Sequence, residues 1–214
     1  MGGVSRRLLR NVWLAGLSIG GTFVLYLAIG GPPVQRLSIA TAYVGLVLLA
    51  ATLVVGPLRE RMGRANPASV GLRRDIGIWA AFGGFVHTVV GLQVHMRGDI
   101  VRYFIPDAAI GGVTKSAIAF LAANYIGLAA TMLLLLLLAI SNDVALRALG
   151  TVRWKRIQRL NYLLFALVVT HGVLYLAVDR ASWVLIVAFV LIVAVTCQIQ
   201  LEGRQSRERL IRRP

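Results

Sequence analysis

Residues 117–140 read AIAFLAANYIGLAATMLLLLLLAI, 24 consecutive residues without an aspartate, glutamate, lysine or arginine. About 20 apolar residues are enough for a helix to cross the roughly 30 Å hydrocarbon core of a bilayer. Of all 214 residues, 58% are hydrophobic and 14% are charged, a balance that a water-soluble fold with a polar surface does not sustain. We therefore expect a transmembrane helix over this stretch and a chain that lives in a membrane.

Further uncharged apolar spans lie on both sides of this stretch, at residues 13–29, 37–55, 76–94, 160–178 and 183–199. Each is as long as a membrane-crossing helix or nearly so. The residues between them are too few and too scattered for a second core. The sequence therefore predicts an all-α, polytopic bundle of six transmembrane helices, with residues 1–214 forming a single integral membrane domain and no soluble flavin or nucleotide domain.

The basic residues are distributed unevenly between the two sides of this predicted bundle. The chain has 23 lysines and arginines and a formal net charge of +15. Eighteen of them lie before the first span or in residues 56–75, 141–159 and 200–214. The positive-inside bias then places both termini in the cytoplasm. Attraction to anionic headgroups of the lipid bilayer explains the basic runs, so we expect no nucleic-acid partner.

Two histidines stand inside spans that hold no other ionisable group except tyrosine. His87 is as far from the start of its span, Ile76, as His171 is from the start of its own, Leu160. Both spans run outward from the cytoplasm, so each imidazole lies about 16 Å above the same boundary. Two imidazoles at equal depth can ligate one metal ion from two sides, as in b-type haem proteins.

Small residues around the two histidines favour this interpretation. Gly84 and Gly91 lie on the helical face of His87, where a flat macrocycle needs to approach the backbone. Bare zinc is less favoured because no third protein ligand accompanies the pair. The alternative is that each histidine only hydrogen-bonds a neighbouring helix. His95 lies further along the span of His87 and is expected at the membrane interface, outside the pair.

Several motifs around the histidines resemble a known family. They are LRRDIGIW at residues 72–79, Val86-His87-Thr88, Ser141-Asn142-Asp143, Leu149-Gly150, RWKRIQRLNY at residues 153–162, and His171. This pattern resembles the haem-binding core of the ferric reductase-like transmembrane family over residues 72–178. Within that family it looks most similar to the haem-binding membrane subunit of the bacterial periplasmic methionine sulfoxide reductase system.

The resemblance implies a multi-pass cytochrome b of the bacterial inner membrane, the electron-transfer component of an oxidoreductase. Such a subunit takes electrons from a cytoplasmic flavin reductase or a quinol donor and passes them through haem to an outer acceptor, such as a periplasmic reductase subunit. His87 and His171 match the outer haem ligands, and no catalytic residue is implied. One haem b is therefore expected.

The inner haem site of two-haem relatives is altered in this sequence. Where those relatives carry a second histidine, earlier on the helix of the outer ligand, this chain has Gln158, and the corresponding place before His87 is Arg73. A flavin (FMN or FAD) or a quinone can fill such a vacant site, with Trp154 or Trp79 for stacking and Arg73, Arg74, Lys155 and Arg156 for phosphates or ring oxygens. Alternatively, these residues only anchor the helix ends at the interface.

The outer side offers fewer signals. Arg97, Arg102, Lys115 and Arg180 are candidates to pair with haem propionates. The connection at residues 95–116 is expected either to dock a periplasmic partner or to rest Tyr103 and Phe104 in the headgroups. Because the inner ligand positions are lost, a haem-free or haem-structural assembly or interaction subunit stays open as an alternative function.

Overall fold

The computed structural model describes residues 3–62, 68–95, 98–105, 115–178 and 182–211. This part of the chain is helical and contains no strand, which confirms the all-α prediction for it. The helices are α1 (Gly3–Ala28), α2 (Pro33–Arg61), α3 (Ala68–Gly91), α4 (Ile100–Phe104), α5 (Lys115–Ala139), α6 (Asp143–Gln158), α7 (Asn161–Val178) and α8 (Trp183–Ile211).

Local sequence explains several helix boundaries. Pro33 opens α2 at a position where no backbone donor is needed, shortly after Gly31, whose φ of 112° places it in a conformation that favours glycine. The Asn142 side chain caps α6 by accepting a hydrogen bond from the backbone N–H of Ala145. Gly150 kinks α6, because its φ of 70° and ψ of 157° are not helical.

Five helical stretches are long and apolar enough to cross a membrane: Ser5–Ala28, Pro33–Arg61, Ala117–Ala139, Asp143–Ala177 and Trp183–Gln205. The fourth stretch runs through both α6 and α7. The expected span at residues 76–94 is helical only to Gly91. α3, which carries Arg73, Arg74 and Asp75 in its first half, is not among the five. The chain is thus a multi-pass membrane protein by its helices, whereas the count of six spans stays a prediction.

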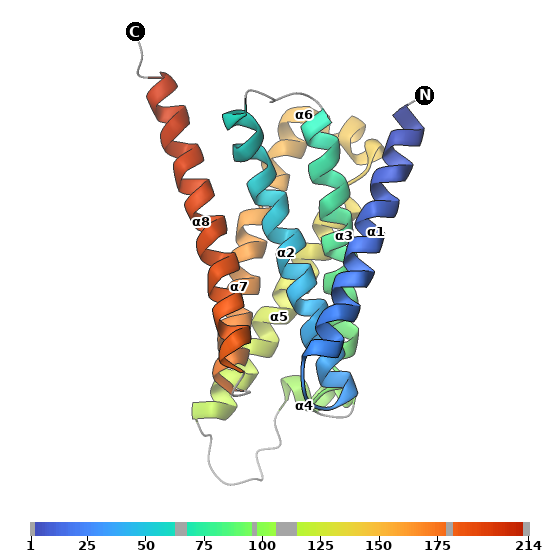
Figure 1. The fold of residues 1–214 in the computed structure, drawn as a ribbon, viewed down its shortest axis with the longest axis vertical. Coiled ribbons are helices and arrows are strands. Elements are labelled where there is room, and N and C mark those ends of the chain that lie inside the picture. Colours follow the sequence, from blue (N-terminus) through green and yellow to red (C-terminus); the bar gives the residue numbers. More distant parts are fainter. Residues whose placement is uncertain (1–2, 63–67, 96–97, 106–114, 179–181, 212–214) are drawn as a thin grey trace.

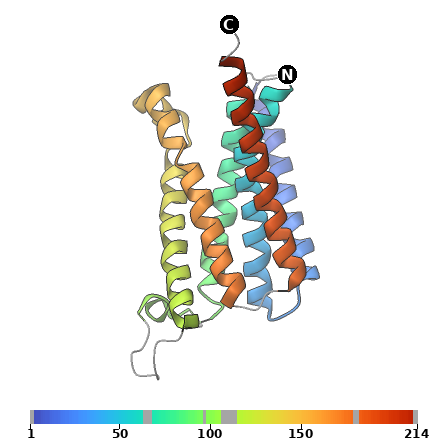
Figure 2. The ribbon, with the colours of Figure 1, turned by 90° about the vertical axis from the view of Figure 1, so that its left-hand side faces the viewer.

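The long helices run side by side along one axis (Figure 1). The first described turn of α1 and the last described turn of α8 lie at the same end of the bundle (Figure 1). Turned by 90°, the bundle shows α5, α6 and α7 on one side and α1, α2, α3 and α8 on the other (Figure 2). We call the end with these two helix termini the inner end and the opposite one, where α4 lies, the outer end.

The core lies where α2, α3, α5, α7 and α8 meet. It is built from small and aliphatic side chains with two phenylalanines: Leu46, Leu49, Ala50, Leu53, Ala80, Ala81, Ala130, Leu134, Leu137, Leu164, Phe165 and Phe189. Glycines bring α2 and α3 close together, since a Cβ on Gly45 would lie 3.7 Å from the backbone nitrogen of Gly84. Small residues at contacts between helices are typical of packing within membranes.

The face of α1 that points away from the bundle is apolar and exposed along most of its length, as expected of a helix that faces lipid. Gly16 and Gly20 form a GxxxG pattern, which favours close helix packing. A Cβ on either glycine would meet nothing within 4 Å, so this pattern is not used inside the described chain. α1 approaches α2 at Gly21 instead, where a Cβ would lie 3.5 Å from Val44.

Candidate functional site

The structure brings His87 and His171 together from opposite sides of the bundle. His87 lies in the last two turns of α3 and His171 lies in the outer half of α7. Their ring centres are 6.2 Å apart and their planes are inclined by 79°. Two metal–nitrogen bonds of about 2 Å each, together with the distance from each nitrogen to its ring centre, give roughly this separation. The pair is therefore spaced as two ligands of one metal ion would be.

The hydrogen bonds of the two rings determine their tautomers. His87 Nδ1 lies 2.9 Å from the backbone oxygen of Ser38 on α2, and His171 Nδ1 lies 2.8 Å from the backbone oxygen of Ala123 on α5. A carbonyl oxygen only accepts, so each Nδ1 carries the proton and donates. Each Nε2 then keeps its lone pair, and this is the arrangement in which imidazoles bind metals. The donor set fits a haem iron with two axial histidines.

Glycines shape the space around the rings, but not all as the sequence suggested. A Cβ on Gly127 of α5 would lie 2.7 Å from His171 Cε1 and Nδ1, so only glycine permits this ring position. A Cβ on Gly91 would lie 3.5 Å from Ser38 Oγ and 3.9 Å from His87 Cε1. Gly84 lies near Gly45 and Leu134. The sequence did not point to Gly127, because its place opposite His171 depends on how α5 packs on α7.

An aromatic and polar cluster adjoins the pair on its outer side. The Tyr175 ring lies 4.9 Å from that of His171 and 5.9 Å from that of His95. His95 is exposed, and its ring centre lies 5.3 Å from that of Phe120. Its expected place at the membrane interface stays a prediction. Tyr103 of α4 is only 2% exposed, so the expectation that it rests in the headgroups is wrong.

Of the four outer basic residues proposed to bind haem propionates, only Arg102 has a described side chain. Arg102 is exposed and pairs with Asp99 at 3.4 Å. Four parts of the outer side lie outside the described residues: Arg97, Arg180, the side chain of Lys115, and residues 106–114 of the predicted docking segment. The expected propionate contacts and partner docking therefore stay predictions.

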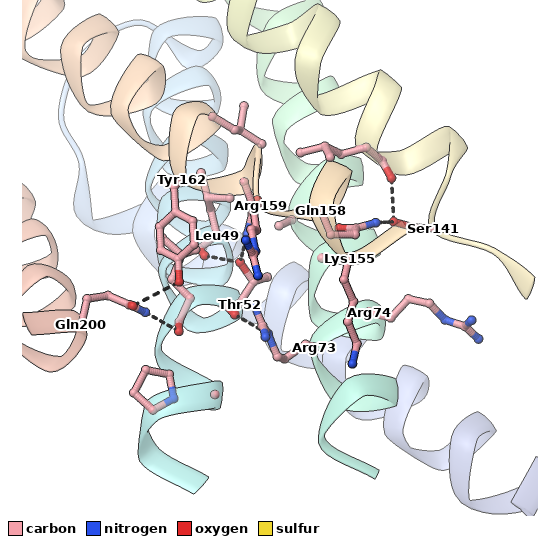
Figure 3. Close-up of a pocket in the computed structure, with 18 of the residues that line it drawn as sticks. Leu49, Thr52, Arg73, Arg74, Ser141, Lys155, Gln158, Arg159, Tyr162 and Gln200 are labelled. Carbon is pink, nitrogen blue, oxygen red and sulfur yellow. Dashed lines mark hydrogen bonds between the residues drawn. The ribbon is translucent and has the colours of Figure 1, made fainter. Parts of the chain in front are cut away.

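A cavity of about 840 Å³ lies on the inner side of the histidine pair. Figure 3 shows residues that line it. Its floor is apolar and includes Leu49, Leu53, Ala81 and Leu134. Six basic residues line it: Arg59, Arg73, Arg74, Lys155, Arg159 and Arg204. Of the described lining residues only Glu60 is acidic. The cavity is thus an apolar pocket with a strongly basic lining.

Polar side chains in the cavity are tied to the surrounding helices (Figure 3). Arg73 Nε donates to the backbone oxygen of Thr52 at 3.0 Å, and Asn161 Nδ2 donates to Thr52 Oγ1 at 2.6 Å. Gln158 Nε2 donates to Ser141 Oγ at 3.3 Å. The buried Nε of Arg74 has no hydrogen-bond partner among the described residues. The structure thus brings the predicted inner-site residues Arg73 and Gln158 to one cavity.

Other predicted inner-site residues divide between two places. Lys155 and Trp154 line the cavity, and Trp154 is buried with its Nε1 donating to the backbone oxygen of Ile140 at 2.9 Å. Trp79 does not line it, but donates from Nε1 to Asn11 Oδ1 on α1. Arg156 is exposed and is not a lining residue. Trp79 and Arg156 are therefore not placed to hold a ligand there.

Gln158 is the last residue of α6, and α7 begins at Asn161. Two residues therefore separate the helix of Gln158 from the helix of His171, although one candidate membrane span, Asp143–Ala177, runs through both. Leu134 lies between the two regions: it lines the cavity, and its side chain would be 3.4 Å from a Cβ on Gly84, one turn before His87. The Leu134 side chain thus lies between the cavity and the helical turn before His87.

A buried ion pair closes the inner end between α1 and α3. Asp75 is fully buried and accepts hydrogen bonds from the Arg10 guanidinium, whose Nε lies 2.7 Å from Oδ2. Arg7 Nε lies 3.4 Å from the other carboxylate oxygen. The sequence alone indicates only a topological role for Arg7 and Arg10, since nothing in their spacing points to a partner so far along the chain.

Comparison with known proteins places these features in context. No protein-family model matches the chain. The chain is 30% identical over 142 residues, 66% of its length, to the haem-binding subunit MsrQ of the protein-methionine-sulfoxide reductase of Ralstonia nicotianae. It is 29% identical over 179 residues, 78% of its length, to the subunit of the same name from Deinococcus radiodurans, and 30% identical over 144 residues, 67% of its length, to that from Xanthomonas axonopodis pv. citri.

These matches cover different shares of the relatives. The chain spans 59% of the Ralstonia protein and 60% of the Xanthomonas protein, and 81% of the Deinococcus protein. The similarity that the motifs around His87 and His171 predict is thereby confirmed: over about two thirds or more of its length, this chain is similar to the haem-binding subunits of protein-methionine-sulfoxide reductases.

Proposed function

We propose that the chain is a membrane electron-transfer subunit that holds one b-type haem between His87 of α3 and His171 of α7. The observation that carries the proposal is the facing pair itself: two rings 6.2 Å apart, each donating from Nδ1 to a backbone carbonyl of a neighbouring helix. Bound haem accepts and passes on one electron at a time. The chain's own residues hold both ligand tautomers and exclude water from the apolar surroundings.

The orientation that we propose has six spans, counting α3, with both termini in the cytoplasm of a bacterial inner membrane. The evidence for it is the bias of basic residues and the position of both described ends at one end of the bundle (Figure 1). Electrons would enter from a cytoplasmic flavin reductase or a quinol donor and leave toward an outer acceptor. A reductase subunit is the acceptor that the relatives' names suggest. In the proposed orientation that subunit lies in the periplasm.

The inner cavity is the proposed entry point. Its apolar floor suits a planar ring, and its basic lining suits phosphates or ring oxygens, so a flavin or a quinone fits its chemistry. Gln158 and Arg73 stand where a two-haem relative has inner ligands, and neither is a haem-iron ligand. We therefore propose one haem and a second, exchangeable redox group at the cavity.

The test is a haem count with a reduced-minus-oxidised spectrum on the purified chain and on three variants. One haem per chain with a sharp α band is expected for the wild type. His87→Ala and His171→Ala should abolish or grossly alter the spectrum, whereas His95→Ala is the control and should leave it nearly intact. Two haems per chain, or an unaltered spectrum in His171→Ala, contradicts the ligand assignment, and a colourless wild type favours an assembly or interaction subunit.

A further inference from the structure

A chain of hydrogen bonds joins the two histidine helices on the outer side of the pair. Tyr103 Oη, from the short helix α4, donates to the backbone oxygen of Gly91 at 3.0 Å and accepts from the backbone N–H of His95 at 2.9 Å. Gly91 lies on α3, one turn beyond His87. Tyr103 therefore fastens α4 to the helical turn next to the first histidine.

The same chain of bonds continues to the second histidine. Asn124 of α5 donates from Nδ2 to the backbone oxygen of Tyr103 at 2.9 Å, and its Oδ1 accepts from Tyr175 Oη at 2.6 Å. Tyr175 lies on α7, one turn beyond His171, and its ring lies 4.9 Å from the imidazole. Asn124 also directly follows Ala123, whose carbonyl accepts the hydrogen bond from Nδ1 of His171.

Two of the three side chains that make these bonds are buried, and Tyr175 is partly buried. Tyr103 is 2% exposed and Asn124 is 7% exposed. A buried polar group that loses its partner keeps its desolvation cost without compensation, so a network of this kind holds its helices at one separation. Its members meet each histidine helix one turn away from the imidazole.

We propose that Tyr103, Asn124 and Tyr175 form a clasp that sets the separation and ring orientation of His87 and His171, and thereby the ligand field of the haem. The proposal rests on the proposed function, and it makes the three side chains positioning residues rather than ligands. Tyr103 acts on the α3 side, Tyr175 acts on the α7 side, and Asn124 couples them. α4 is then a structural member of the haem site and not merely a connection at the surface.

The experiment compares Tyr103→Phe and Tyr175→Phe with Tyr125→Phe in the full haem-loaded chain. Tyr125 is the matched control, because its hydroxyl also joins α5 to α4, by donating to the backbone oxygen of Phe104 at 3.0 Å, but has no bond to the clasp. The readouts are the low-spin signal of the oxidised haem in electron paramagnetic resonance and the rate of haem transfer to apomyoglobin.

We expect Tyr103→Phe and Tyr175→Phe to shift the low-spin signal and to speed haem release about tenfold, the lower end of what outer-shell partners contribute to metal affinity. The double variant should release haem less fast than two independent effects predict, because both hydroxyls act in one network. Tyr125→Phe should match the wild type. If Tyr103→Phe does not accumulate, Tyr175→Phe, which keeps the ring against His171, decides the question alone.

The clasp is overturned if both clasp variants behave as Tyr125→Phe does while the wild type shows a normal haem spectrum. A wild-type chain without haem, or with a spectrum unaltered by His171→Ala, overturns the proposed function and the clasp with it. The two failures are therefore distinguished by the wild-type spectrum, which is recorded first.

Discussion

The outer and inner halves of the bundle share α2, α3, α5 and α7 but differ in how they are filled. Around His87 and His171, each ring is bonded to a neighbouring helix and one ring is seated against Gly127. Around the inner cavity, about 840 Å³ of space is lined by six basic side chains. This difference agrees with our proposal of a fixed haem in the outer half and an exchangeable group, with anionic or polar atoms, in the inner half.

The largest effect is expected at Gly127, where the outer half has no room for an added side-chain atom. Gly127→Ala puts a methyl group 2.7 Å from two atoms of the His171 ring, so the ring or α5 must move. We expect haem occupancy to fall about tenfold or more, as when an outer-shell contact to a metal ligand is lost. The measurement is haem per chain after purification.

Gly16→Ala is the control for that experiment, since a Cβ there meets nothing within 4 Å. It should leave haem occupancy unchanged. Full occupancy in Gly127→Ala would show that the outer site adapts to its ligand, and the contrast between a fixed and an open half would fail.

A second large effect is expected at the ion pair of Asp75 with Arg10 and Arg7. This pair joins α1 to α3, so part of the inner end is tightly held even though the cavity is open. Asp75→Asn keeps the size of the side chain but leaves Arg10 and Arg7 without their buried counter-charge. Leaving a fully buried charge unpaired costs about 3–5 kcal/mol, but the Arg10 and Arg7 side chains are 31% and 45% exposed, so water offsets part of the loss and we expect a cost of about 1–3 kcal/mol. Unfolding of the purified protein in mixed detergent should show this loss, and wild-type stability would mean that lipid headgroups replace the carboxylate.

The next effect concerns electron entry. Arg73→Ala combined with Gln158→Ala should slow haem reduction by the native donor about tenfold, since losing even one hydrogen bond to a charged group costs about 1.5 kcal/mol. Haem content should stay normal because neither residue contacts the histidine pair. Stopped-flow reduction in vesicles, with donor on the cytoplasmic side, measures the rate.

Arg153→Ala serves as the matched control for this pair, because Arg153 lies on α6 but is exposed and is not a lining residue of the cavity. Its haem should be reduced at the wild-type rate. Equal rates in all three proteins would make the cavity inert and would support reduction of the haem by another route.

The smallest effect is expected at the ion pair between Arg74, which is 14% exposed, and Asp143, which lies nearer the surface at the start of α6. Asp143 is 58% exposed, so solvent screens the interaction. Asp143→Asn should leave the midpoint of unfolding in mixed detergent close to that of the wild type. A loss of stability as large as that of Asp75→Asn would mean that the inner end depends on both pairs alike.

Much of the fold followed from composition and length. Each uncharged span lies within a long helix or overlaps one, because a backbone in hydrocarbon must satisfy its hydrogen bonds internally. Less regular elements escaped prediction. Residues 141–159 looked like a connection, but fold as α6 with a kink at Gly150, and α4 was not expected at all.

The candidate site was predictable to a similar degree. Counting residues along two helices that run the same way was sufficient to pair His87 with His171. It was not sufficient to find Gly127, Ser38 or Ala123, because their roles arise from contacts between helices that are far apart in sequence. One of the two alternatives for residues 95–116 rested Tyr103 in the headgroups, whereas its hydroxyl bonds and burial put it inside the bundle.

By itself, the sequence determined that the chain has membrane-crossing segments, that it is helical and that its two histidines lie at equal depth. Each of these follows from hydropathy and the rise per residue, which can be read along one helix at a time. Only the tertiary structure decided which backbone carbonyls hold the imidazoles, that Arg73 and Gln158 line one cavity, and that α4 reaches the histidine helices through Tyr103. Those features depend on how helices are rotated and packed against one another, and that packing is a property of pairs of surfaces rather than of any one segment.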